Sequence, residues 1–192
     1  MTTEPRKQGA GRVQLLSIAA VFTVPLALAA WMYYFDSMVP DSATNKGALL
    51  LPTLSLRDEL PDSALHDKQS NQWLMLYAGS VECGDDCNKA LVRLRQSRLM
   101  LGKYMQRVGR VFLRAESTPD TVDISEQHPG LITISDKGLI RLLEKKRPKE
   151  LQRGGCYLID PLGNLVMYFP PDLDPKEMVG DIKHLLKLSH IG

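Results

Sequence analysis

Cysteine is scarce in this sequence of 192 residues, which contains only three of them. That scarcity excludes a scaffold held together by many disulfides. A hydrophobic fraction of 44% beside a charged fraction of 24% also excludes a wholly disordered or collagen-like chain. Familiar catalytic patterns are absent too: a Ser-His-Asp order, a glycine-rich phosphate loop and paired zinc-binding cysteines. The length fits one domain of ordinary size with a packed core.

A strong excess of charge is missing as well, because 24 Lys and Arg residues face 22 Asp and Glu residues. The small excess lies at the N-terminus, where Arg6, Lys7 and Arg12 are opposed by Glu4 alone. The remaining chain is electrically balanced. Affinity for nucleic acid depends mainly on clustered Lys and Arg, so we exclude nucleic acid as a partner.

A long uncharged run lies near the N-terminus, from Val13 to Phe35. As a helix it would extend ~34 Å, enough to cross a hydrocarbon core of about 30 Å. The basic residues before it predict a cytoplasmic N-terminus by the positive-inside bias. A cleaved signal peptide is the alternative, because Ala27-Leu28-Ala29 resembles a cleavage site. The anchor is favoured because the apolar run continues beyond that site.

The run divides the chain into four expected parts. We expect a cytoplasmic tail, a single transmembrane anchor, a polar tether and an exported domain at residues 1–12, 13–35, 36–46 and 47–192. The expected location is the bacterial inner membrane, with the domain in the periplasm. Cysteines can be oxidised in that compartment.

The exported part begins with the pattern of a parallel βαβ unit. Residues 73–78 form a continuous apolar run typical of a buried strand. Apolar residues at helical spacing predict a long amphipathic helix over 90–108, and residues 110–113 predict a second strand. Strand, helix and strand in this order predict parallel pairing.

The second half of the exported part completes an α/β domain. A hairpin of two strands at 156–159 and 164–169 precedes a last helix with Asp174 as its N-cap. We also expect a short strand at 131–134, a short helix at 138–145, and loops at 58–72 and 115–130. This order is the skeleton of a thioredoxin-like domain.

Two cysteines, Cys83 and Cys87, lie between the first predicted strand and its helix. Four residues apart at a helix start, they face the same side and are close enough for a disulfide or for one metal ion. The helix N-terminus favours a thiolate, whereas Glu82, Asp85 and Asp86 raise the thiol pKa. A disulfide that only staples the loop is the alternative, and its short ring would stabilise little.

Together with this Cys-x-x-x-Cys segment, three further segments resemble the Sco/SenC family. They are Arg110-Val-Phe-Leu, Pro119-Asp120-Thr121 and Tyr157-Leu158-Ile159-Asp160-Pro161-Leu162-Gly163. The resemblance covers roughly residues 47–190. It implies a membrane-anchored thioredoxin-like protein of cytochrome c oxidase assembly, which binds copper through both cysteines and a histidine. The implied partner is an oxidase subunit or another copper chaperone.

This sequence departs from the family pattern at the third copper ligand. The position of the family histidine falls at about Gln152, and Asn88 follows Cys87 where the family usually has proline. Two thiolates suit Cu(I), whereas Cu(II) prefers imidazole. His128 is the only candidate substitute, although it is expected to be a solvated loop residue. His66 is also expected in a loop, and the two C-terminal histidines at the surface.

The third cysteine, Cys156, has two interpretations. It is a functional thiol, as a resolving cysteine or a replacement metal ligand, or it is a buried residue that acts as a small apolar side chain. The buried residue is favoured. Gly154 and Gly155 before it would let a partner's backbone approach closely. The leading hypothesis is thiol–disulfide exchange, in which Cys83 attacks and Cys87 resolves. The alternatives are a Cu(I)-binding module with Cys83, Cys87 and Cys156 as ligands, and a non-catalytic docking factor.

Overall fold

The computed structural model describes residues 10–35, 45–79, 83–114, 124–189 and 191. The chain divides into two compact units, Met1–Ala43 and Thr44–Gly192. Several predicted features lie outside the described residues: Glu82, the segment 119–121, His190, most of the tail and most of the tether. The two units are described separately below.

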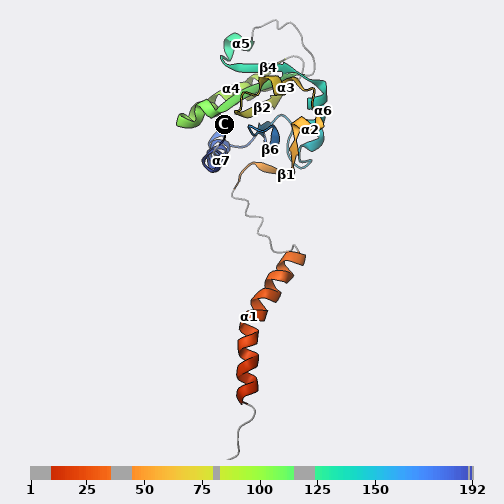
Figure 1. Ribbon diagram of the computed structural model, residues 1–192. Coiled ribbons are helices and arrows are strands. Elements are labelled where there is room, and N and C mark those ends of the chain that lie inside the picture. The colour runs from red at the N-terminus through yellow and green to blue at the C-terminus, as the bar shows by residue number, and fades with distance from the viewer. Residues whose placement is uncertain (1–9, 36–44, 80–82, 115–123, 190, 192) are drawn as a thin grey trace, which may run out of the picture. The chain divides into compact units, whose positions relative to one another are not determined.

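The described part of the first unit is the helix α1 (Ala10–Phe35), which begins three residues before the predicted span (Figure 1). Its segment Val13–Trp31 is long and apolar enough to cross a membrane. Pro25 lies inside the helix, a position that a membrane-spanning helix tolerates. Its described apolar side chains are exposed, as expected of a surface that faces lipid. A single N-terminal apolar helix is therefore confirmed.

The second unit is built on a six-stranded mixed sheet with the order β1-β6-β5-β2-β3-β4. The strands β2, β3 and β4 are parallel, with β4 at one edge of the sheet, whereas β5, β6 and β1 continue the sheet in antiparallel pairs. The strands span Ala48–Ser55 (β1), Trp73–Ala78 (β2), Val108–Arg114 (β3), Leu131–Ser135 (β4), Cys156–Ile159 (β5) and Asn164–Phe169 (β6). The predicted βαβ unit and hairpin are both confirmed.

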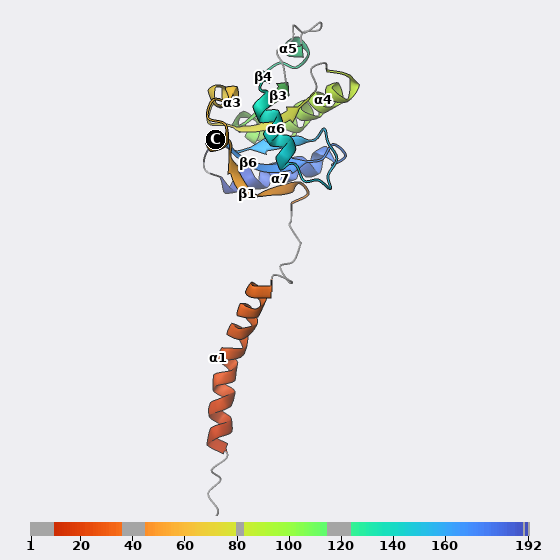
Figure 2. The ribbon, with the colours of Figure 1, turned by 90° about the vertical axis from the view of Figure 1, so that its right-hand side faces the viewer.

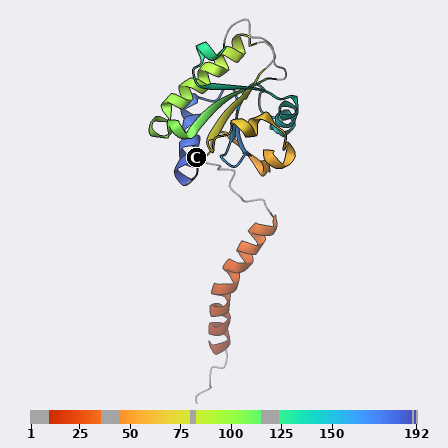
Figure 3. The same cartoon turned by 45° about the horizontal axis from the view of Figure 1, so that its top comes forward.

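Helices cover both faces of this sheet (Figures 2 and 3). One face packs against two helices that also contact each other, α4 (Asp85–Met100) and α7 (Pro175–Leu188). The other face packs against α6 (Lys137–Lys146) and the short helices α2 (Leu56–Glu59) and α3 (Ala64–Lys68). Because side chains alternate along each strand, the central strands are buried on both faces.

The structure corrects two predicted boundaries. The long helix does not run to residue 108: α4 ends at Met100, and a 3₁₀ helix η1 (Gly102–Arg107) leads into β3. Gly102 has a φ of 61°, a left-handed conformation that glycine adopts without strain and that stops an α-helix. The predicted loop at 58–72 contains α3 and the last two residues of α2. Serine side chains cap these helices, Ser55 for α2 and Ser63 for α3.

Candidate functional site

The cysteine segment lies where the central parallel strands end. β2 ends at Ala78, and α4 begins at Asp85 with Cys87 in its first turn. In β2 and β3 the carboxyl ends share one edge of the sheet, because Ala78 pairs with Leu113. Open α/β sheets place their binding sites outside this edge. The predicted placement of the cysteines is therefore correct.

Cys83 and Cys87 form a disulfide, with their Cα atoms 5.1 Å apart. Cys83 is half-buried, whereas Cys87 is 5% exposed and packs in the core between the sheet and α4. Cys83 Sγ also lies 3.6 Å from Oδ1 of Asn88, the residue that follows Cys87. Cys83 is therefore the more exposed of the two cysteines, while Cys87 is shielded.

Negative charge surrounds the start of α4. Gly84 is the N-cap without a capping side chain, and Asp85 and Asp86 occupy the first turn with exposed side chains. Asp86 forms only an exposed ion pair with Lys89, 3.4 Å away. Burial and the Asp86 carboxylate together raise the pKa of Tyr77 near the end of β2. The Asp86 carboxylate thus acts on Tyr77, and the two carboxylates in the first turn oppose the effect of the positive helix end on a thiolate.

A groove of about 860 Å³ runs beside the disulfide, between α4 and the turn that joins β6 to α7. Asp85, Asn88 and Val92 line its α4 side, and residues 171–175 line the other. Arg93 joins the two sides, because its guanidinium donates to the carbonyl oxygens of Pro171 and Leu173. These two bonds fix the turn after β6 against α4. Sequence reasoning did not identify Arg93, since nothing local indicates these bonds.

The third cysteine, Cys156, is a free thiol buried in the same core cluster as Cys87. It opens β5 and pairs with Tyr77 of β2. Burial raises the pKa of Cys156 to about 12, although the nearby Arg93 charge acts in the opposite direction. The thiol therefore stays protonated and shielded at neutral pH, which agrees with its interpretation as a buried apolar residue.

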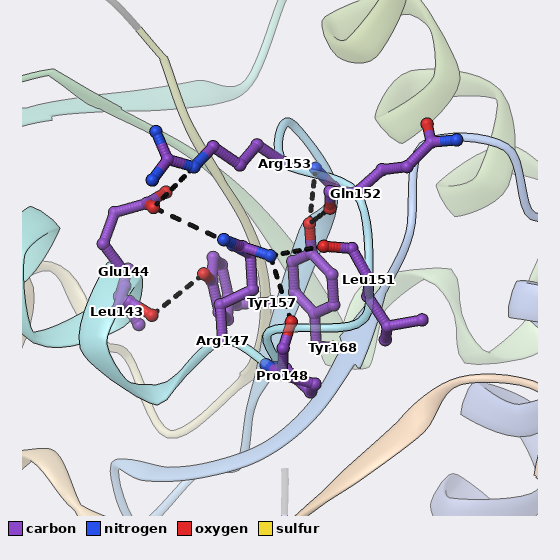
Figure 4. A network of polar contacts seen from close by, with 10 residues as sticks. Leu143, Glu144, Arg147, Pro148, Leu151, Gln152, Arg153, Tyr157 and Tyr168 are labelled. Carbon is purple, nitrogen blue, oxygen red and sulfur yellow. Dashed lines mark hydrogen bonds and ion pairs between the residues drawn. The ribbon is translucent and has the colours of Figure 1, made fainter.

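A polar network fixes the loop before β5 (Figure 4). The Tyr168 hydroxyl donates to the carbonyl oxygen of Gln152 and accepts from the backbone N–H of Gly155 at 3.0 Å. On the other side of the loop, Arg147 donates to the carbonyl oxygens of Pro148 and Leu151. The exposed Gln152 side chain points away from this network. No sequence motif indicates the network, because its members come from three separate elements.

The predicted role of the glycine pair before β5 is wrong for Gly155. A Cβ on Gly155 would collide with the carbonyl oxygen of Phe169 and lie 2.6 Å from the Tyr168 hydroxyl. The backbone that approaches this glycine is therefore that of β6, not that of a partner. Gly154 faces open space and has a φ of 82°, so its requirement for glycine is conformational.

The predicted solvated position of His128 is also wrong. His128 is 4% exposed and lies just before β4, at the amino end of the parallel strands. The cysteines follow the carboxyl end of β2, so this structure does not bring His128 to them. His66 lies in α3, where its Nε2 is 2.8 Å from the carbonyl oxygen of Leu60, whereas His184 is exposed on α7 as predicted.

Metal ligation remains a prediction for this chain. Among the described residues, no three or more His, Cys, Asp or Glu side chains gather as a metal site. The two sulfurs of Cys83 and Cys87 are soft donors of the kind that hold Cu(I) once their disulfide is reduced. The protonated, buried thiol of Cys156 would have to lose its proton to join them.

Comparisons with known proteins agree with this architecture. ScoI of Arabidopsis thaliana with copper bound is similar at 19% identity and a TM-score of 0.50, over 64% of this chain and 89% of that chain. Yeast Sco1 with copper bound is similar at 19% identity and a TM-score of 0.49, over 64% and 80% of the two chains. A SCO1/SenC family lipoprotein of Bacillus anthracis has 12% identity and a TM-score of 0.48, over 62% and 84%. No curated protein matches the sequence.

At such low identity, the similarity to the Arabidopsis structure establishes a shared fold and nothing more. Two family models match the sequence itself. One, described as a transmembrane-like N-terminal domain, matches residues 5–36. The other, described as a transmembrane-like, thioredoxin-like C-terminal domain, matches residues 73–189, which is more than half of the chain. The fold is therefore thioredoxin-like, and the chain belongs to the transmembrane-like, thioredoxin-like family.

Proposed function

We propose that this protein is a membrane-anchored thiol–disulfide exchange factor that assists assembly of the copper centre of cytochrome c oxidase. The observation that carries the proposal is the Cys83–Cys87 disulfide at the start of α4, in which Cys83 is half-buried and Cys87 is buried. The proposed location is the bacterial inner membrane, with the thioredoxin-like domain in the periplasm. The proposed substrate is a cysteine pair of an oxidase subunit or of a copper chaperone.

In the proposed reaction, the reduced protein transfers two electrons to a disulfide of its partner. The Cys83 thiolate attacks one partner sulfur, the partner S–S bond breaks, and the released partner thiolate takes up a proton. The Cys87 thiolate then attacks Cys83 Sγ, which breaks the mixed disulfide and frees the second partner thiol. The Cys83–Cys87 disulfide is thereby restored, and a thiol reductant on the same side of the membrane must reduce it for another cycle.

The order of attack follows from exposure. Cys83 is half-buried whereas Cys87 is buried, so Cys83 is the cysteine that a partner would approach, and Asn88, which contacts Cys83, lines a groove beside α4. Cys87 lies one turn away on the same face, close enough to resolve the mixed disulfide. Asp85 and Asp86 disfavour the thiolate, so we expect a more reducing pair than one flanked by neutral residues.

Trapping of the mixed disulfide tests this mechanism in the full-length chain. The variant Cys87→Ser cannot resolve, so we expect it to accumulate a covalent adduct with a partner protein that reductant releases. Cys83→Ser should give no adduct, and Cys87→Ser combined with Cys156→Ser should trap as well as Cys87→Ser alone. An adduct that depends on Cys156, or trapping by Cys83→Ser but not by Cys87→Ser, would refute the assigned order.

A Cu(I)-binding module is the second candidate. It is favoured because Cys87 and Cys156 belong to one core cluster and Cys83 packs against that cluster. Gln152, at the position of the family histidine by resemblance, supplies an amide that copper binds poorly. Titration of the reduced full-length chain with Cu(I) decides. Stoichiometric binding that Cys156→Ser weakens favours the metal carrier, whereas no binding favours exchange.

A non-catalytic docking factor is the remaining alternative. It would be indicated if cells that carry both Cys83→Ser and Cys87→Ser show unchanged oxidase maturation.

A further inference from the structure

Two basic side chains are buried at the amino end of the parallel strands, away from the disulfide. Arg110 of β3 is 3% exposed, and His128, which follows the short helix α5 (Ile124–Gln127), is 4% exposed. Arg110 occupies a strand position on the same face as Val108 and Phe112, where alternation calls for an apolar side chain. Burial of an arginine there requires compensation, because an unpaired buried charge is costly.

The compensation within the described residues is incomplete. Arg110 Nη2 donates to the carbonyl oxygen of Pro129, and the backbone at Gly130 passes close to the same nitrogen. Arg110 Nε and Nη1 and His128 Nδ1 are buried, and no described residue forms a hydrogen bond with them. Buried donors are nearly always satisfied in folded proteins. The two Arg110 nitrogens therefore indicate a missing acceptor, and His128 Nδ1 can add a third donor when it carries a proton.

More positive charge lies beside this pair. Arg98 Nε of α4 donates to the carbonyl oxygen of Val108 at 2.6 Å, two residues before Arg110 on the same strand face. Arg95 lies one helical turn before Arg98. Across the described ranges, no carboxylate forms an ion pair with Arg95, Arg98 or Arg110. We call these three arginines, together with His128, the arginine–histidine cluster.

The pKa shifts agree with a shortage of negative charge among the described residues near this cluster. Burial lowers the pKa of Arg110, and the charges of Arg98 and Arg95 lower it further. Burial also lowers the pKa of His128, with smaller effects of Arg110 and Arg95 in the same direction. An anion among these groups would reverse the electrostatic part of both shifts.

We propose that the arginine–histidine cluster binds a small inorganic oxyanion of the sulfate or phosphate type. The oxygens of such an ion would accept from Arg110 Nε and Nη1, with His128 Nδ1 as a further donor in its protonated or suitable neutral form. Arg95 and Arg98 would supply long-range attraction from α4. The site differs from the thiol site in chemistry and place, since it lies before β4 and the disulfide lies after β2.

Sulfate is the probe for the test, because its charge stays constant between pH 5 and pH 8. Thermal unfolding of the full-length chain in detergent is measured while sulfate replaces chloride at constant ionic strength. We expect a saturable rise in Tm, of about 3 to 6 °C at ten times the dissociation constant, from binding to the folded state alone. In NMR spectra the ring signals of His128 should move with the same saturation.

Three variants separate a site from a general salt effect. Arg110→Met removes two of the donors and should abolish the saturable rise in Tm, even if the variant itself is more stable. Arg95→Gln should weaken sulfate binding several-fold, whereas Arg141→Gln removes an exposed charge from α6 on the opposite face of the sheet and should not change it. A rise that Arg110→Met retains, or no saturable rise in the natural chain, would overturn the proposal.

Discussion

The substitution Gly155→Ala tests how tightly β6 packs against the start of β5. The added Cβ would collide with the carbonyl oxygen of Phe169, and it would lie 2.6 Å from the Tyr168 hydroxyl. Relief requires the two neighbouring strands to move apart. That movement lengthens the hydrogen bond from Gly155 N–H to the Tyr168 hydroxyl, now 3.0 Å, and disturbs the bond from the hydroxyl to Gln152.

The cost follows from these two effects. Overpacking of a tight contact costs about 1–3 kcal/mol. Leaving a buried donor or acceptor unsatisfied costs about 1–3 kcal/mol more. We therefore expect Gly155→Ala to lower the free energy of unfolding by about 4 kcal/mol, which corresponds to a fall in Tm of about 10 °C.

Tryptophan fluorescence provides the assay. The chain has two tryptophans, and Trp73 is buried at the start of β2. In a Trp31→Phe background its emission reports unfolding of the thioredoxin-like domain alone, without a contribution from α1. Urea unfolding of the full-length chain in detergent then gives the free energy of unfolding for each variant.

Two other glycines are matched controls. Gly180 lies in α7 with open space at its Cβ, so Gly180→Ala should stabilise by about 0.5–1 kcal/mol. Gly154 also has open space but a φ of 82°, so Gly154→Ala should cost about 1–2 kcal/mol from backbone strain alone. If Gly155→Ala costs no more than Gly154→Ala, the proposed collision with β6 does not exist.

Three further predictions follow from burial. Burial raises the pKa of the Cys156 thiol to about 12, so this thiol should resist alkylation at pH 8 in the folded chain and react once urea unfolds the chain. Rapid labelling of the folded chain, detected by mass spectrometry, would contradict this. Because folding lowers the pKa of His128, the unfolded chain binds more protons than the folded chain as the pH falls below about 6.5. The free energy of unfolding should therefore fall with the pH in this range, and it should fall less in His128→Gln. Urea titrations at several pH values that give the same dependence on pH for both proteins would refute this. The Asp181 carboxylate accepts hydrogen bonds from the backbone N–H groups of Lys46 and Gly47, at 2.8 Å each. Asp181→Ala should therefore destabilise the domain by about 2–3 kcal/mol and speed hydrogen exchange at both amides. Unchanged exchange would show that Asp181 does not hold the segment before β1 in place.

The order of the elements was predictable because its signals are local. Apolar runs identified β2, β3 and the hairpin, and Asp174 marked the start of α7, where its side chain accepts from the backbone N–H of Lys176. The end of α4 was missed because one glycine in a left-handed conformation, Gly102, outweighs an apolar pattern that continues into β3. Short helices such as α3 were missed because one helical turn carries too little periodicity to be recognised.

The sequence by itself determined that an apolar helix precedes an α/β domain and that two cysteines stand between a strand and a helix. Both facts depend on neighbours in the chain. Only the tertiary structure decided that Cys87 and Cys156 share a core and that His128 lies beside Arg110 instead of in solvent. Those placements depend on strand register and on which helix covers which face, and contacts between residues distant in the sequence leave no periodic signal.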